Sequence, residues 1–293
     1  MLPGIPALLA LLPAPRPQAA PPPAAPALEL ARPAPATGIE VSYLGGEAFL
    51  FRSRAHSVLV DVFVGPDPAR APIPAEALAA MKEGQGMFDR VRVCIGTHLH
   101  AAEIFPAGAA ARYVEARRQT SGPSTLFDGP HQVIERVRSV EGVDLPLPLT
   151  NNRWAKLGES SCLQFVGLRI DYLPLPHAGD AKGEEQHLGL SIRHAGVHVV
   201  HLVHAAPRLE DLERYQAILA NPQLVIVPYG WLLDEGAKDL LQNRVAPRRV
   251  LVTGVPVEGA AELAPRLEAA FPGVIVPTKP LETFAFEPPS AGR

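Results

Sequence analysis

An apolar run that ends directly in two histidines constrains the fold of this chain more than any other feature. Residues 91–96 (VRVCIG) have the composition of a core strand, and Thr97-His98-Leu99-His100 follows without a break. Because residues two apart in an extended segment face the same side, both imidazoles can reach one ion. The junction therefore predicts a metal site at the end of a core strand. The alternative, two polar strand-end groups in an open cleft, stays open.

This junction resembles the signature of the metallo-β-lactamase fold, a superfamily of metal-dependent hydrolases in which Thr-His-x-His-x-Asp-His follows a hydrophobic strand. Thr97, His98 and His100 match that pattern. Ala102 stands in place of the Asp, and Glu103 stands in place of the third His. The chain is therefore similar to a divergent, lactonase-like member with a degenerate motif.

The segments around the motif resemble the same family over roughly residues 38–286. Residues 41–51 and 57–61 are similar to the opening hairpin of the family, which ends near the metal in an Asp, here Asp61. Residues 129–134 are similar to the loop and helix start that follow the first helix. We expect Asp61 to orient a metal-bound histidine, as carboxylates commonly do.

The second half of the chain follows the family pattern too. Residues 175–179 (LPHAG) resemble the segment that supplies the next ligand, so His177 is a ligand candidate, although an ordinary surface histidine is an alternative. Residues 197–205 resemble a strand that ends in Gly-Asp, and Val203 and His204 stand at those two positions. His204 thus replaces the Asp that bridges two metals in the family.

The resemblance implies a single zinc ion. His98, His100 and His177 would form a three-histidine site with water in the fourth position. The role of His204 stays open between fourth ligand, hydrogen-bond partner of the water and proton carrier. If His204 completes the tetrahedron, the ion is structural.

A second metal site is expected to be lost. It would need Ala102, Glu103 and Gly254, of which two offer no ligand atom, and a lone carboxylate holds at most a weak or shared ion. Three other histidines, His194, His198 and His201, alternate with or adjoin valines, and we expect them to be side chains of the sheet.

The order of the predicted elements indicates an α/β fold. Strands are expected at 41–51, 58–63, 91–95, 168–172, 188–192, 197–202, 224–227, 250–252 and 274–276, and helices at 74–82, 107–118, 131–140, 209–220 and 258–270. This order predicts two mixed β-sheets flanked by helices. The resemblance implies the four-layer αββα sandwich, with residues 142–158 connecting its halves.

Residues 1–37 form a separate segment, which contains eleven of the 33 prolines and many alanines. The apolar stretch 8–12, followed by small residues at 17–20, indicates a signal-like segment and a Pro/Ala-rich disordered linker. We therefore expect a periplasmic or secreted protein. Pro3, Pro6 and the lack of a preceding Lys or Arg leave a cytoplasmic protein with a plain tail as the alternative. The domain is expected at 38–287, with a tail at 288–293.

Composition and charge exclude several classes of partner. A net charge of −3 offers no basic surface for nucleic acid, and no later stretch has the roughly 18 to 20 apolar residues needed to span a bilayer. A small-molecule substrate is the class of partner that remains possible. The two cysteines, Cys94 and Cys162, fit buried core thiols, and the sequence does not settle whether they pair.

Two functions remain open at this stage. The first is a hydrolase in which one zinc ion activates water against an ester, lactone, amide or phosphoester, with His204 or Glu103 moving the proton. Ala102, in place of the family's Asp, predicts slow or altered chemistry. The second is a catalytically inactive binding or scaffold protein whose metal site is lost or structural.

Overall fold

The structure is a computed structural model of residues 1–293. It describes residues 30, 33–63, 71–99, 113, 116, 125–140, 149–151, 159–178, 186–206, 208–256 and 258–289.

The first sheet contains seven strands among the described residues, in the spatial order β13-β1-β2-β3-β4-β5-β6. Its strands are β1 (Ile39–Gly45), β2 (Ala48–Arg52), β3 (Ser57–Val60), β4 (Val91–Ile95), β5 (Leu126–Gly129), β6 (Leu149–Asn151) and β13 (Glu282–Phe286). Strands β1, β2, β3 and β13 pair antiparallel, whereas β3 to β6 run parallel. The last strand along the chain, β13, therefore pairs with the first strand, β1, and forms one edge of the sheet.

The second sheet contains six strands in the described part of the chain, in the order β12-β11-β10-β9-β8-β7. They are β7 (Ser161–Phe165), β8 (Leu168–Pro176), β9 (Gln186–His194), β10 (Val197–His201), β11 (Leu224–Pro228) and β12 (Val250–Thr253). Strands β10, β11 and β12 are parallel, and the others are antiparallel. Both sheets are thus mixed.

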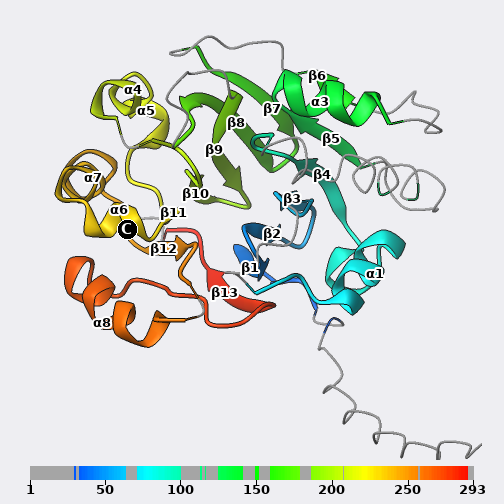
Figure 1. The fold of residues 1–293 in the computed structure, drawn as a ribbon. Coiled ribbons are helices and arrows are strands. Elements are labelled where there is room, and N and C mark those ends of the chain that lie inside the picture. The colour runs from blue at the N-terminus through cyan, green and yellow to red at the C-terminus, as the bar shows by residue number, and fades with distance from the viewer. Residues whose placement is uncertain are drawn as a thin grey trace, which may run out of the picture.

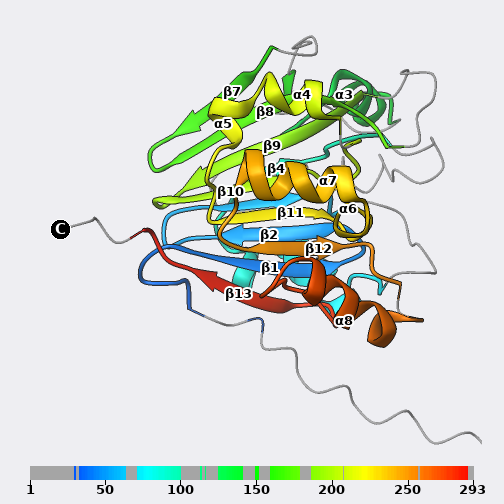
Figure 2. The same ribbon diagram turned by 90° about the vertical axis from the view of Figure 1, so that its left-hand side faces the viewer.

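Helices cover the outer face of each sheet (Figure 1). The first sheet carries α1 (Ala75–Glu83) and α3 (His131–Arg138), with the short helix η1 (Gly86–Phe88) beside them. The second carries α4 (Leu209–Glu213), α5 (Gln216–Leu219), α6 (Gly230–Leu233), α7 (Glu235–Leu240), η2 (Leu241–Val245) and α8 (Ala260–Ala270). Figure 2 shows α4 to α8 in front of the strands of the second sheet. None of the helices in the described segments has the length and apolar character that a membrane crossing requires.

Alternating side chains on each strand explain why the strands read as continuous apolar runs. On β2, Leu50 packs under the helices of the first sheet, whereas Phe49 and Phe51 pack between the sheets. On β11, Val225 packs under the outer helices and Ile226 packs between the sheets. A strand that is buried on both faces needs apolar residues at every position. The predicted αββα sandwich is therefore confirmed.

Several predicted boundaries were wrong. The expected strand 41–51 is two strands, because Gly45 and Gly46 adopt positive φ angles and turn the chain. The expected helix 209–220 is split into α4 and α5, where the buried Tyr215 donates its hydroxyl to the carbonyl of Pro174. Of the expected strand 274–276, only Ile275 forms a bridge, with Leu251.

Other elements were missed or lie outside the described part of the chain. Strands β5, β6, β7 and β13 were not predicted, and neither were α6, α7 and η2. Within the helix expected at 107–118, the structure describes Tyr113 and Ala116, both of them helical. Within the connection expected at 142–158, only residues 149–151 are described, and they form β6.

Candidate metal centre

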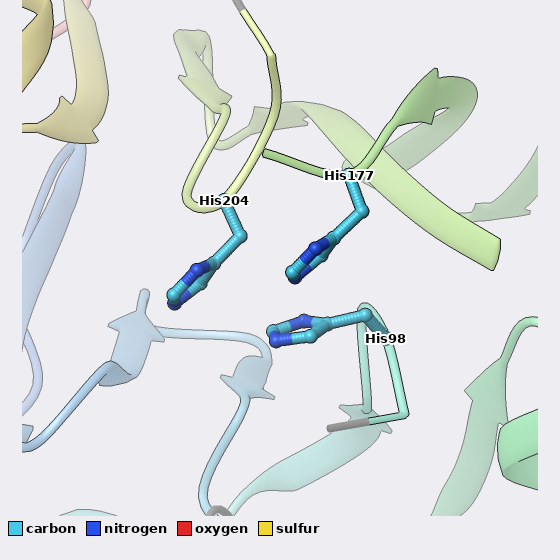
Figure 3. Close-up of side chains that lie close together, drawn as sticks. All are labelled: His98, His177 and His204. Carbon is cyan, nitrogen blue, oxygen red and sulfur yellow. The ribbon is translucent and has the colours of Figure 1, made fainter. Parts of the chain in front are cut away.

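Three histidines lie together at one edge of the sandwich (Figure 3). His98, His177 and His204 each bring a ring nitrogen within 4.8 Å of the other two. The ring centroids are 5.1 Å apart for His98 and His177, 4.8 Å for His98 and His204, and 5.5 Å for His177 and His204. His98 is buried, and the other two rings are half-buried, so the cluster lies at a partly open surface.

Each of the three histidines follows the end of a different strand. His98 lies just beyond β4, His177 directly follows β8, and His204 lies just beyond β10. The backbone joins these ends. His98 forms an isolated bridge with His187 at the start of β9, and the amide of Ala178 donates to the carbonyl of His204 at 2.7 Å. The two sheets therefore meet at this edge, and that meeting brings the histidines together.

His98 is held through Thr97 and Asp61. Asp61 accepts the backbone N–H of Thr97 through Oδ1 and its hydroxyl through Oδ2, both at 2.7 Å. The Thr97 hydroxyl lies 2.8 Å from Nδ1 of His98. All three residues are buried. Asp61 thus orients a histidine of the cluster, as expected, but it does so through Thr97.

Glu47 lies against His204 from the turn between β1 and β2. Its Oε1 contacts Nε2 of His204, and its side chain is 1% exposed. Glu47 was not among the site residues predicted from the sequence. The available signal was an acidic residue between a Gly-Gly turn and an apolar strand, because an acidic side chain is almost never fully buried unless it is paired.

Two further histidines lie behind the cluster as neutral, buried rings. His187 hydrogen-bonds the carbonyl of Val203 through Nε2 at 2.6 Å, and burial, followed by the proximity of His177 and His204, holds its pKa well below the usual value. His201 packs edge-on against Phe49 and Phe51, and burial lowers its pKa to about 3.

The remaining predicted site residues divide into two groups. His100, Ala102 and Glu103 lie outside the described residues. His194 and His198 lie in β9 and β10, so their placement in the sheet is confirmed along with that of His201.

The donor set fits one zinc ion. Zinc binds imidazole nitrogen at about 2.0 to 2.1 Å in tetrahedral geometry, so two nitrogens on the same ion lie about 3.4 Å apart. Nitrogens that lie within 4.8 Å of one another need to close by no more than about 1.4 Å to reach that spacing. Neutral imidazole is a common zinc ligand, and three of them leave one position for water.

Known structures share this architecture. YhfI from Bacillus subtilis, a metallo-β-lactamase fold protein, superposes with a TM-score of 0.58 at 13% identity, over 85% of this chain and 100% of that one. Igni18, a metallo hydrolase from the archaeon Ignicoccus hospitalis, gives 0.53 at 18% identity, over 86% of this chain and 99% of that one. CmlA, a diiron β-hydroxylase from Streptomyces venezuelae, gives 0.53 at 13% identity, over 86% of this chain and 55% of that one.

Sequence comparison adds no relative, since no protein-family model and no curated protein matches the chain. Two packed mixed sheets with outer helices define an αββα sandwich, and a histidine cluster lies where the sheets meet. The structural likenesses show that this chain has the metallo-β-lactamase fold, as its motif predicted.

Proposed function

We propose that this protein is a metal-dependent hydrolase that holds one zinc ion through His98, His177 and His204. The observation that carries the proposal is the convergence of these three ring nitrogens, from three strand ends, within 4.8 Å. Histidine ligands with one open position are typical of zinc hydrolases. His100, which the resemblance also assigns to the metal, lies outside the described residues and stays a candidate for a further ligand.

Different residues of the chain would have different roles at this site. A zinc ion held by these residues would lower the pKa of a bound water molecule to about 7 and so supply a nucleophile at neutral pH. Asp61 and Thr97 orient the ring of His98. Of the two residues expected to move a proton, His204 takes the role of a ligand in this assignment, which leaves Glu103 as the candidate proton carrier.

An apolar groove next to the turn between β1 and β2 favours one class of substrate. The groove has a volume of about 760 Å³, within the range of small-molecule sites, and its walls include Tyr43, Ala71, Val255, Pro256, Ala261 and Ala264. Two wall residues hydrogen-bond the turn that precedes Glu47. Tyr43 donates its hydroxyl to the carbonyl of Gly46 at 3.3 Å, and the amide of Gly46 donates to the carbonyl of Ala71 at 2.8 Å. The wall of the groove is therefore bonded to the residue that precedes Glu47 in the chain.

The charge of the groove favours an ester, lactone or amide over a phosphoester. No Lys or Arg is among its described wall residues, and Glu268 adds a carboxylate. A phosphoester carries negative charge, for which such a wall offers no partner. We therefore expect an uncharged acyl substrate whose apolar part occupies the groove.

Metal content and hydrolysis together test the proposal on the full chain. Protein purified without chelator and resupplied with zinc should contain about one zinc ion per chain by mass spectrometry. His98→Ala and His177→Ala should lose it, whereas His198→Gln, a change of a sheet histidine outside the cluster, should keep it. The loaded protein should hydrolyse nitrophenyl esters or lactones faster than bis-nitrophenyl phosphate.

Each result has a distinct meaning. An absence of metal in the wild type after zinc resupply contradicts the proposal. Bound zinc without turnover of any ester, lactone, amide or phosphodiester favours the alternative drawn from the sequence, a binding or scaffold protein with a structural metal.

A further inference from the structure

The side chain of Glu47 stands in a place where a carboxylate is costly. It is 1% exposed, and a buried carboxylate is destabilising unless it is paired and hydrogen-bonded. Its Oε1 contacts Nε2 of His204, whose side chain is 17% exposed. The carboxylate therefore has a specific neighbour at the candidate metal centre, and the pairing needs an explanation.

The turn before Glu47 fixes the position of its side chain. Gly45 has a φ of 123°, and a Cβ there would lie 2.9 Å from backbone atoms of residues 71–73. Gly46 has a φ of 60°, and its amide donates to Ala71. Only glycine adopts the first conformation without strain, so the turn is seated tightly against the neighbouring segment. Glu47 leaves this turn directly into β2.

The contact leaves one nitrogen of His204 for a metal. An imidazole has two ring nitrogens, and Nε2 of His204 faces the carboxylate. Among the described residues, the group of ligand atoms that lie within 4.8 Å of one another contains His98 and His177 along with His204, but not Glu47. The carboxylate therefore lies beside the ring of His204 and outside the three-nitrogen group.

We propose that Glu47 is a positioning residue that accepts the Nε2–H of His204 and so presents the Nδ1 lone pair to the metal. This inference rests on the proposed function, because it assigns a role at the same site. Carboxylates that accept the second N–H of a metal-bound histidine fix its tautomer and raise its basicity. His204 is then a ligand, and neither a free proton carrier nor a partner of the bound water.

The first test reads the tautomer in metal-free protein. Nitrogen-15 correlation spectra at about pH 8.5 should show His204 with its proton on Nε2 and its lone pair on Nδ1. In Glu47→Leu this preference should disappear. The matched control is Glu40→Leu, because Glu40 lies on the same hairpin and pairs with Arg52 at 2.6 Å, away from the cluster. That change should lower stability and leave the His204 tautomer as it is.

The second test reads zinc affinity by chelator competition. Glu47→Leu should raise the zinc Kd on the order of 10- to 100-fold, and Glu47→Gln, whose amide oxygen still accepts a hydrogen bond, should raise it less. Glu40→Leu should not change it.

Three results overturn the proposal. They are a proton on Nδ1 in the wild type, a ring that carries protons on both nitrogens at that pH, and a tautomer that Glu47→Leu leaves unchanged. The tautomer is measured without metal or substrate. A protein that binds no zinc but shows the expected tautomer therefore contradicts the proposed function and not the role of Glu47.

Discussion

The hydroxyl of Thr97 lies 2.8 Å from Nδ1 of His98 and determines which nitrogen of that ring carries the proton. Its single proton goes to Oδ2 of Asp61, so the hydroxyl oxygen accepts the Nδ1–H of His98. The lone pair of His98 is then on Nε2. Hence a hydrogen-bond relay that starts at the end of β3 sets the tautomer of a histidine that follows β4.

Thr97→Val should weaken zinc binding through this relay. The change keeps the shape of the side chain but frees His98 to rotate and to change tautomer, so the zinc Kd should rise on the order of tenfold or more. Stability should fall by about 1 to 2 kcal/mol, because a buried hydrogen bond is lost. Zinc competition and urea unfolding measure the two effects.

The control for Thr97→Val is Thr125→Val. Thr125 is also buried, and its hydroxyl donates to the carbonyl of Val91 at 2.8 Å. It should lose similar stability without a change in the zinc Kd. Equal zinc affinities in Thr97→Val and the wild type contradict a role of Thr97 in orienting His98.

His201→Leu should stabilise the protein. In the described structure the ring is fully buried, and neither of its nitrogens has a hydrogen-bond partner. Leaving such polar atoms unpaired costs about 1 to 3 kcal/mol, and an apolar side chain against Phe49 and Phe51 removes that cost. Urea unfolding should show a gain of about 1 kcal/mol. A loss of stability of that size indicates that His201 has a polar partner.

Stability should fall with acidification below about pH 6.5. Burial lowers the pKa of His194 from 6.5 to about 4, so between these values the unfolded chain binds a proton that the folded protein does not. The stability is fully present above pH 6.5 and is lost as the pH falls toward 4. From pH 7.5 to 5 this one group removes about 2 kcal/mol.

His194→Gln should reduce this pH dependence. The amide of Gln can still donate to the carbonyl of His56, which Nε2 of His194 reaches at 3.0 Å, but it does not titrate. Burial also lowers the pKa values of His198 and His201, so part of the dependence remains in the variant. Urea unfolding at pH 7.5 and pH 5 measures the difference. If the variant and the wild type lose equal stability between pH 7.5 and pH 5, the assignment of this pH dependence to His194 is wrong.

Ala264→Trp should change substrate preference, because it fills the apolar groove. We expect the KM for esters of long acyl chains to rise on the order of tenfold, with little change for acetate esters, since one buried methylene is worth about 0.8 kcal/mol. The control is Glu262→Trp, which adds the same ring at an exposed position of α8 outside the groove. A uniform change across chain lengths contradicts the groove as the acyl site.

The sequence predicted the layered fold because both sheets are buried on both faces. A strand such as β11 is a continuous apolar run, and such runs are recognisable without tertiary information. The short strand β6, in contrast, has three residues, and β13 begins with two polar residues at an edge of its sheet. Their strand character comes from pairing with neighbours that are distant in sequence, and local patterns do not carry that information.

The candidate site was predictable where residue type and local pattern coincide. His98 was a ligand candidate because it follows an apolar strand, whereas His177 and His204 were candidates because of the resemblance to the metallo-β-lactamase fold. Glu47 was missed because its role depends on a contact with His204, which lies 157 residues further along the chain. The indirect action of Asp61 through Thr97 depends on register between β3 and β4, which only the folded sheet defines.

The division of the three histidines between the sheets has a consequence for the lifetime of the folded chain. His98 extends from the first sheet, whereas His177 and His204 extend from the second, so the full ligand set exists only while the two sheets are packed together. Under the proposed function, a free zinc concentration of a hundred times the Kd would therefore stabilise the packed sheets by about 2.7 kcal/mol. We expect the zinc-free protein to open about a hundredfold more often between the sheets, so proteases should degrade it faster than the zinc-loaded protein.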